Sequence, residues 1–313
     1  MSTVAAVSHL VLFGFNRTQV SSDERHARLV HLLSCQGRHI FVRYCSRAFR
    51  PEGEPLLTVA NHSSILDDPG ILAAMLPWDV LLHPKLMRWA ICSQEICYPD
   101  AATATFFGAG KVLPIERGGG VDQKLLLDFS RRLANGDWCH IFPEGKTVQT
   151  GTLGGRSRPK SEEIGLFKWG VGKVVAHAPR TPRIIPFYHT GMQNVMPEDP
   201  VSKDVLPKQP TLFNDITVRV GDEVDVSDLI AAHEAKYGPL WKYSSMASKG
   251  EDDERMWASS SPENRRLYSA ITRRIQAALY TLETEARAEL GKDYPTTPKI
   301  VASGEYRALL ERK

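Results

Sequence analysis

Apolar runs long enough to cross a bilayer are absent from this chain. A spanning helix requires about 20 consecutive apolar residues, and the best candidate, residues 4–15, is shorter and is interrupted by Ser8 and His9. It is a poor secretory signal as well, because no basic residue precedes it and no small-residue cleavage site is evident. Its length suits a segment that lies in a membrane surface. We therefore predict an interfacial membrane segment at residues 1–20, with lipid contacts from Leu10, Leu12, Phe13 and Phe15.

The chain has few cysteines, no recognised metal-binding motif and a small net charge. The five cysteines are odd in number and include no C-x-x-C pair, so we expect reduced, buried thiols rather than a disulfide framework or a zinc site. No H-E-x-x-H motif occurs, and we predict neither a metal nor a cofactor. A net charge of only +3 does not indicate nucleic acid as a partner, since clustered basic residues are its usual footprint.

Short apolar strands alternate with helical patterns along the chain. This order predicts an α/β fold with a central mixed sheet covered by helices. We expect one domain over residues 21–243 and 266–290, a flexible polar insertion at 244–265, and a C-terminal tail at 291–313. The predicted strands are residues 56–60, 112–115, 138–142, 184–188 and 216–220, and the predicted helices are 23–33, 39–49, 70–75, 122–133, 166–177 and 267–282.

A histidine and an aspartate directly follow the first strand of the predicted sheet. His62 and Asp67 are separated by four residues across a strand-to-helix turn, so their side chains can meet. A carboxylate on one ring nitrogen fixes the histidine tautomer and leaves the other nitrogen free as a base. The alternative is a histidine satisfied by a backbone group beside aspartates that cap the helix, a role that we assign to Asp68 because Pro69 follows it.

Three other segments also begin or end at predicted strands. Glu144, in the sequence F-P-E-G-K at residues 142–146, can bind a substrate hydroxyl or simply occupy a solvated turn. Arg117 lies between a strand and three glycines, which suits a bidentate phosphate contact, although the glycines can equally be a plain connection. The strand at 184–188, which contains Pro186, reads by itself as core.

Together and in this order, these segments resemble the glycerophospholipid acyltransferase superfamily. The resemblance covers about residues 55–220 and is closest to its mitochondrial, cardiolipin-remodelling transacylase branch. This sequence has Ser63 where the superfamily usually has Gln, and a basic, glycine-rich stretch between Lys146 and Leu166. The matching segments are N-H-x-x-x-x-D-D-P at 61–69, K-L-M-R-W at 85–89, G-D-W at 136–138, F-P-E-G-K at 142–146, F-K-W-G-V-G at 167–172 and H-T-G-M at 189–192.

The resemblance implies roles for individual residues. His62 and Asp67 take the part of a catalytic dyad, Arg117 and Lys146 face a phosphate, and Glu144 with Gly145 binds the acceptor. Supporting motif positions are Asn61, Ser63, Phe142, Pro143 and Pro186.

The same resemblance implies a chemistry and a location. The implied reaction moves an acyl chain between a phospholipid and a lysophospholipid without coenzyme A, with cardiolipin, monolysocardiolipin and phosphatidylcholine as substrates. The implied location is a mitochondrial membrane surface that faces the intermembrane space. The alternatives are a relative that uses acyl-coenzyme A as donor, a non-catalytic membrane-binding protein of the same fold, and a metal-dependent lipid hydrolase.

A second interfacial segment is predicted around Phe167 and Trp169. Apolar side chains there alternate with Lys168 and Lys173, as in helices that lie in a membrane surface. The competing interpretation is an ordinary core helix.

Overall fold

The structure, a computed structural model, describes residues 17–22, 53–76, 82–149, 153, 167–199, 210–211, 214–294 and 298. Outside them lie the predicted helices at 23–33 and 39–49 and nearly all of the basic stretch after Lys146. The predicted lipid-contacting side chains of Leu10, Leu12, Phe13 and Phe15 also lie outside the described residues.

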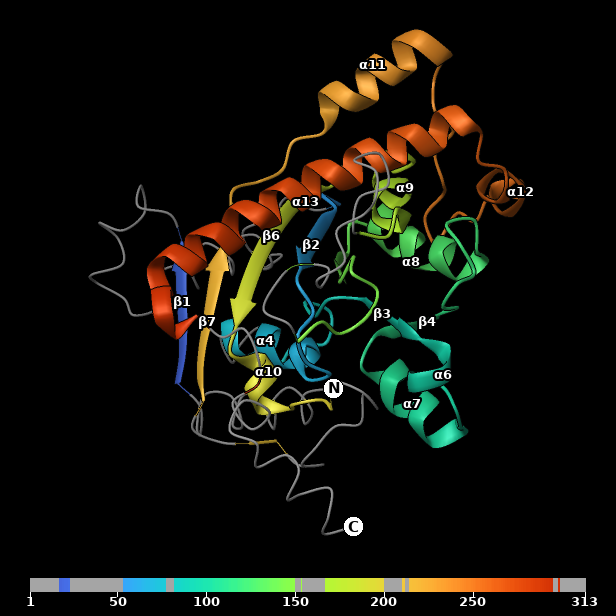
Figure 1. The fold of residues 1–313 in the computed structure, drawn as a ribbon. Coiled ribbons are helices and arrows are strands. Elements are labelled where there is room, and N and C mark those ends of the chain that lie inside the picture. The colour runs from blue at the N-terminus through green and yellow to red at the C-terminus, as the bar shows by residue number, and fades with distance from the viewer. Residues whose placement is uncertain are drawn as a thin grey trace.

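A five-stranded sheet forms the centre of the fold, in the order β1-β7-β6-β2-β5. Strands β6 and β7 are antiparallel and all other neighbours are parallel, so the predicted mixed sheet is confirmed (Figure 1). Every residue of β2 and β5 is buried, as expected of apolar strands covered on both faces. The strands are β1 (Arg17–Ser22), β2 (Leu56–Ala60), β5 (Trp138–Ile141), β6 (Arg183–Thr190) and β7 (Asp215–Val220).

The edge strand β1 corrects the first domain boundary. Residues 17–20 were predicted to belong to the interfacial membrane segment, but they pair in parallel with β7 as part of the sheet. The interfacial segment stays a prediction for residues 1–16, which lie outside the described residues.

A second sheet of two parallel strands extends the first beyond β5. It consists of β3 (Ala90–Ser93) and β4 (Val112–Ile115), connected through α6 (Gln94–Cys97) and α7 (Ala101–Ala109). The amide of Trp89 donates to Trp138 O at 2.8 Å, and the amide of His140 donates to Trp89 O at 2.7 Å. Because this bridge is also parallel, the carboxyl ends of β2, β5, β3 and β4 all point to the same edge.

Helices cover both faces of the central sheet (Figure 1). The longest, α13, has a buried stripe formed by Leu267, Ile271, Ile275, Leu279 and Leu282, as predicted. It packs closely against α9, where a Cβ atom on Gly172 would lie only 2.1 Å from the carbonyl oxygen of Tyr268. The helices are α4 (Asp67–Met75), α8 (Lys124–Ala134), α9 (Gly170–Ala176), α10 (Met192–Val195), α11 (Ser227–Tyr237), α12 (Asp253–Ala258), α13 (Pro262–Leu290) and the 3-10 turn η3 (Gly291–Asp293).

Residues 244–265 are not a flexible insertion. They contain α12, whose Trp257 is 1% exposed and donates from its indole nitrogen to Gln123 O at 3.0 Å. Asp253 is buried as well, with Oδ2 lying 3.1 Å from Arg131 Nη2. The start of the predicted tail also packs, since the hydroxyl of the buried Tyr294 lies 2.6 Å from that of Tyr188. The polar composition of these segments gave no indication of the buried contacts made by Trp257, Asp253 and Tyr294.

The predicted interfacial segment around Phe167 and Trp169 is part of the core. Phe167 is buried, Trp169 packs against the core, and α9 follows with buried valines. The ammonium of Lys173 is also buried and donates to Asp122 Oδ1 at 2.5 Å and to Ser260 Oγ at 3.0 Å. Burial lowers the pKa of Lys173, against the opposing influence of Asp122. The interfacial prediction was wrong here, and the core-helix interpretation holds.

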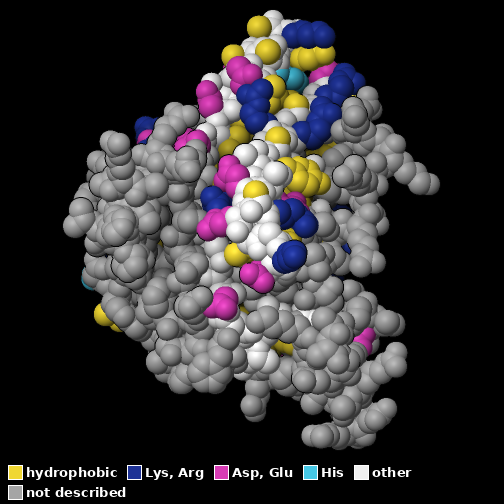
Figure 2. Space-filling model, turned by 60° about the vertical axis from the view of Figure 1, so that its left-hand side comes forward, with side chains coloured by type: hydrophobic (Ala, Val, Ile, Leu, Met, Phe, Trp, Pro, Cys, Tyr) yellow, Lys and Arg dark blue, Asp and Glu magenta, His cyan; other side chains and the backbone are white. Residues whose placement is uncertain are grey.

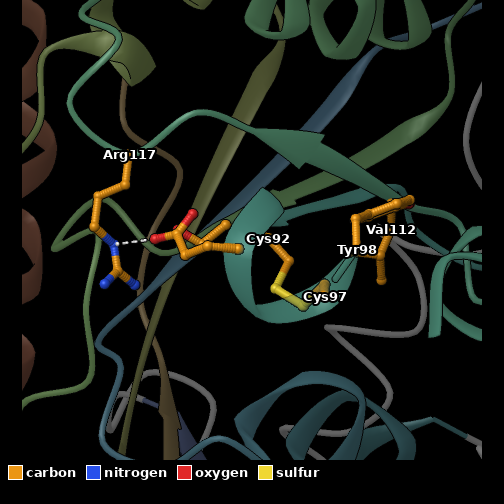
Figure 3. Close-up of a disulfide and its surroundings, with 7 residues drawn as sticks. Cys92, Cys97, Tyr98, Val112 and Arg117 are labelled. Atoms are coloured by element: carbon orange, nitrogen blue, oxygen red, sulfur yellow. Dashed lines mark hydrogen bonds and ion pairs between the residues drawn. A yellow bond between two sulfur atoms is a disulfide. The ribbon is translucent and has the colours of Figure 1, made fainter. Parts of the chain in front are cut away.

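The absence of disulfides was also a wrong prediction. Cys92 and Cys97 are joined, with Cα atoms 6.1 Å apart, a separation that suits a disulfide. The single turn of α6 folds the chain back between them (Figure 3). Cys139 is buried and keeps its thiol outside any disulfide, as expected.

The outer side of α13 is highly charged. Basic and acidic side chains alternate over the face that includes α11 and α13 (Figure 2). Arg266 Nη2 donates to Glu263 Oε1 at 2.8 Å, and Arg274 pairs with Asp228. Among the helices that the structure describes, none combines the length and the apolar composition needed to span a bilayer.

Candidate active site

Three parallel strands place the candidate site residues at one edge of the sheet. Asn61 and His62 follow β2, Phe142 and Glu144 follow β5, and His189 lies near the carboxyl end of β6. Strand β2 lies between the other two and is parallel to both, so the three ends meet. In open α/β sheets, ligands bind outside the carboxyl ends of the strands.

His62 and Asp67 meet as predicted. His62 Nδ1 lies 2.9 Å from Asp67 Oδ2, and the same oxygen accepts from the amides of Ser63 at 2.6 Å and Ser64 at 2.9 Å. The Asp67 side chain is fully buried, whereas that of His62 is 21% exposed. Since a carboxylate only accepts, Nδ1 donates to Asp67, and this tautomer leaves the lone pair on Nε2. Within the described part of the chain no group hydrogen-bonds to Nε2, which suits a general base.

The loop after β5 fixes the position of His62 from two sides. The ring of Phe142 stacks on the imidazole, with centroids 4.3 Å apart and planes 13° apart. The His62 amide donates to Glu144 Oε1 at 2.7 Å, and the Val148 amide donates to His62 O at 2.7 Å. Glu144, predicted to bind the acceptor, is itself buried, and this contact ties it to the backbone of His62.

The rest of the F-P-E-G-K segment forms a tight turn. The amide of Gly145 donates to Phe142 O at 3.1 Å, and its φ of 68° favours glycine. Pro143 is buried, and its carbonyl accepts from the amide of Lys168 at 2.7 Å. Lys146 is exposed just beyond the turn. Gly145 therefore shapes the loop, and Lys146 is accessible for the phosphate contact that was predicted.

His189 is a site residue that the sequence reasoning did not assign. Asn61 donates from Nδ2 to His189 O and accepts at Oδ1 from the His189 amide, both at 2.9 Å. The His189 ring donates from Nε2 to Asn61 O at 2.9 Å, and that nitrogen also lies 3.6 Å from Asp67 Oδ2. Burial lowers the pKa of His189, although Asp67 opposes this effect, so the ring is neutral. The segment H-T-G-M contained the signal, but it gave no role to the histidine.

His140 is the second histidine behind the dyad. Its Nδ1 lies 2.8 Å from Thr58 Oγ1, and its ring packs edge-on against Phe142. Burial lowers the pKa of His140 well below its ordinary value, with nearby Arg88 contributing in the same direction. A neutral histidine thus supports the aromatic ring that stacks on His62.

Asp68 has only part of its predicted role. Its backbone is extended, with φ −116° and ψ 119°, as expected before Pro69 at the start of helical structure. Its carboxylate caps no amide and instead accepts from Arg88 Nε at 2.7 Å. Arg88 also donates from Nη1 to Gly110 O at 3.1 Å, so it links the dyad turn to the end of α7.

Arg117 is not brought into contact with the dyad. It follows β4 at the same edge of the extended sheet, half exposed, and its Nε lies 3.3 Å from Glu95 Oε1 (Figure 3). Pro186, the other motif position, is buried inside β6.

A small polar cavity lies behind the dyad. Its volume is about 20 Å³, which is room for about one water molecule and far too little for an acyl chain. Ser63 Oγ and His189 Nδ1 are buried there without a hydrogen-bond partner among the residues that the structure describes. Among those same residues, no three His, Cys, Asp or Glu side chains could hold a metal ion. The lining includes Asn61, Ser63, Glu144, Tyr188, His189 and Tyr294.

Comparisons with known proteins identify the family. Residues 37–190 match the family described as Acyltransferase. An N-acylphosphatidylethanolamine synthase of Arabidopsis thaliana is 33% identical over 246 residues, which cover 76% of this chain and 80% of the relative. The chain belongs to the glycerophospholipid acyltransferase superfamily. It is an acyltransferase, as the motifs predicted.

Tafazzins are also among the relatives. Tafazzin of Drosophila melanogaster is 32% identical over 230 residues, and tafazzin of Saccharomyces cerevisiae is 26% identical over 223 residues. These matches cover 74% and 60% of this chain but only 52% and 56% of the two relatives, so the chain spans about half their length. The predicted closeness to this branch is confirmed. A crystal structure of the 1-acyl-sn-glycerophosphate acyltransferase of Thermotoga maritima aligns with a TM-score of 0.40 at 12% identity, over 91% of this chain and 92% of that one.

Proposed function

We propose that this acyltransferase moves a fatty acyl chain from a phospholipid to a lysophospholipid without coenzyme A, with His62 as general base. The observation that carries the proposal is the 2.9 Å contact between His62 Nδ1 and the buried Asp67 Oδ2. Two backbone amides donate hydrogen bonds to that same oxygen, which fixes the orientation of the carboxylate. The carboxylate in turn fixes the orientation of the imidazole.

The acceptor hydroxyl gives its proton to His62 Nε2 as its oxygen attacks the ester carbonyl of the donor. The resulting imidazolium is stabilised by the Asp67 carboxylate. The tetrahedral intermediate then expels the glycerol oxygen of the donor, which takes the proton back from Nε2 and leaves as a lysophospholipid. General base catalysis of this kind contributes about 10²–10⁴-fold to the rate. The acceptor itself is the nucleophile, so no acyl-enzyme forms.

The resemblance to tafazzin supports cardiolipin, monolysocardiolipin and phosphatidylcholine as substrates, at a mitochondrial membrane surface facing the intermembrane space. Lys146 and Arg117 are both exposed, the first in the loop that holds His62 and the second at the same edge of the sheet. Each is accessible to a phosphate, and binding a phosphate there would orient the acceptor hydroxyl.

A second candidate function is N-acylation of phosphatidylethanolamine. The plant relative named for that product is 33% identical, and the match covers 80% of its length. The same base serves an amine nucleophile, because the proton lost on attack again goes to His62 Nε2. Only the acceptor differs.

A labelled-acyl assay separates these functions. The purified protein is incubated without coenzyme A in vesicles whose phosphatidylcholine carries a labelled acyl chain, with monolysocardiolipin or phosphatidylethanolamine as acceptor. We expect label in cardiolipin. Label on the amine of phosphatidylethanolamine would establish the second candidate instead, and transfer seen only when acyl-coenzyme A is supplied would refute the donor assignment. His62→Ala protein is the control for transfer that does not depend on the enzyme.

A further inference from the structure

Helix α7 is uncharged on every side, and it rests against β4 with no residue fully buried. Its sequence, A-A-T-A-T-F-F-G-A, contains no charged residue, and none of its side chains is buried. The large apolar residue Phe106 is 51% exposed. A helix that is apolar all round is normally buried in a core or in a membrane. The outer face of α13, with its interspersed basic and acidic side chains, shows how the chain builds a helix surface that meets water (Figure 2).

The exposed position of α7 is built into the local structure. Asp100 caps the helix by accepting from the amides of Ala102 at 2.8 Å and Thr103 at 2.9 Å. Just before the cap, the hydroxyl of Tyr98 donates to Val112 O, which ties the segment to β4. The disulfide between Cys92 and Cys97 closes the preceding turn (Figure 3). The helix is therefore held outward by defined contacts.

The few polar groups of α7 are satisfied within it. Thr103 Oγ1 donates to Asp100 O at 3.0 Å, and Thr105 Oγ1 donates to Ala101 O at 2.7 Å. No side-chain hydroxyl of the helix thus needs water. This suits hydrocarbon, where an unsatisfied polar group is costly.

Exposed apolar side chains also occur beside α7, at Ile96, and in the dyad turn, at Ile65. Ile96 of α6 is 55% exposed, and α6 and α7 project together at one corner of the molecule, far from α11 (Figure 1). Arg88 connects the end of α7 at Gly110 O to the carboxylate of Asp68, directly beside the dyad. In that same turn, between His62 and Asp67, Ile65 is 50% exposed. An exposed apolar side chain therefore lies in the turn that carries the proposed chemistry, and Arg88 ties that turn to α7.

We propose that the surface formed by Ile96, α7 and Ile65 inserts into the boundary between headgroups and acyl chains of a phospholipid bilayer. The choice of a bilayer as occupant rests on the proposed function, because lipid substrates must enter the site from the membrane. Two exposed basic residues support a bilayer as the occupant. Lys85 lies on the segment that leads into β3 and Arg117 on the segment that leaves β4, where headgroup phosphates would meet them. Insertion would hold the dyad turn against the lipid surface.

Vesicle flotation tests this surface with a matched control. Phe106→Glu is compared with Met256→Glu, which changes a residue that is 37% exposed on α12, a helix that lies apart from α6 and α7 (Figure 1). With vesicles of phosphatidylcholine and cardiolipin, we expect Phe106→Glu to lower the partition coefficient about tenfold or more, and Met256→Glu to leave it unchanged. Flotation of Phe106→Glu at the wild-type level would overturn the proposal.

A second variant keeps the test valid if the glutamate disturbs folding. Phe106→Trp preserves the apolar side chain, and its added fluorescence, taken as the difference from wild type, should shift to the blue with vesicles and be quenched by brominated phosphatidylcholine. Met256→Trp should show neither change. Insertion would be refuted if the emission of Phe106→Trp were the same with and without vesicles. It would also be refuted if Phe106→Glu still floated with vesicles but no longer self-associated, and that result would assign the surface to a second copy of the chain.

The two proposals fail separately. Flotation does not require acyl transfer, so a protein that binds vesicles through α7 but transfers no acyl chain would refute only the proposed function. Both proposals would be supported if Phe106→Glu lost acyl transfer in vesicles but kept the wild-type rate with short-chain phospholipids dissolved as monomers.

Discussion

Replacing Glu144 by Ala separates two roles for the loop after β5. The structure shows Glu144 Oε1 accepting from the amide of His62 at 2.7 Å in a buried environment. The alanine variant leaves that amide without its acceptor, at a cost of about 1–3 kcal/mol. The backbone of His62 can then shift towards other partners. A misplacement of about 1 Å at a catalytic group costs about 100-fold in rate.

The assay is kcat and KM for acyl transfer in vesicles, beside thermal unfolding to confirm folding. We expect Glu144→Ala to lower kcat about 100-fold with little change in KM. Glu144→Gln keeps a carbonyl oxygen for the amide and should stay within about tenfold of wild type. A raised KM with unchanged kcat in both variants would refute this reasoning and restore the acceptor-binding role implied by the resemblance.

Two further predictions concern stability. Trp257→Ala removes a buried indole and should lower the free energy of unfolding in urea by about 3–5 kcal/mol; a loss below about 1 kcal/mol would mean that residues 244–265 are loosely attached after all. Burial lowers the pKa of His177 to about 4, whereas the unfolded chain has about 6.5, so the unfolded state binds more protons between these values. The contribution of His177 to the free energy of unfolding is therefore fully present above pH 6.5 and falls as the pH is lowered, with a loss of about 2 kcal/mol at pH 5. His177→Asn, which retains a donor for Trp241 O, should flatten the pH dependence of urea unfolding between pH 8 and 5, and an unchanged slope would contradict the assignment.

The parts of the fold that the sequence predicts are those governed by local pattern. The stripe on α13 and the apolar strands β2 and β5 follow from periodicity and composition, which act over a few residues. The His62–Asp67 contact belongs to the same class, because five positions across one turn suffice to bring the groups together. A local pattern can therefore predict this contact.

The missed features depend on contacts between distant residues. The reciprocal bonds of Asn61 and His189 join positions 128 apart, and those of His62 and Glu144 join positions 82 apart. Neither spacing is visible before the order of strands is known. Lys173 looked like an interfacial lysine because its partner Asp122 lies 51 positions away. Residues 244–265, whose composition favours disorder, are likewise anchored by contacts of Trp257 with Gln123 and of Asp253 with Arg131.

The most direct test of the central claim is the single-turnover rate of acyl transfer by His62→Ala, measured on vesicles that the variant still binds. The dyad mechanism predicts a loss of about 10³-fold, with partial recovery when imidazole is added. Asp67→Asn should lose nearly as much. The neighbouring Asp68→Asn, whose carboxylate contacts Arg88 and not the base, should lose far less. Transfer by His62→Ala within about tenfold of wild type would contradict the assignment of His62 as the base.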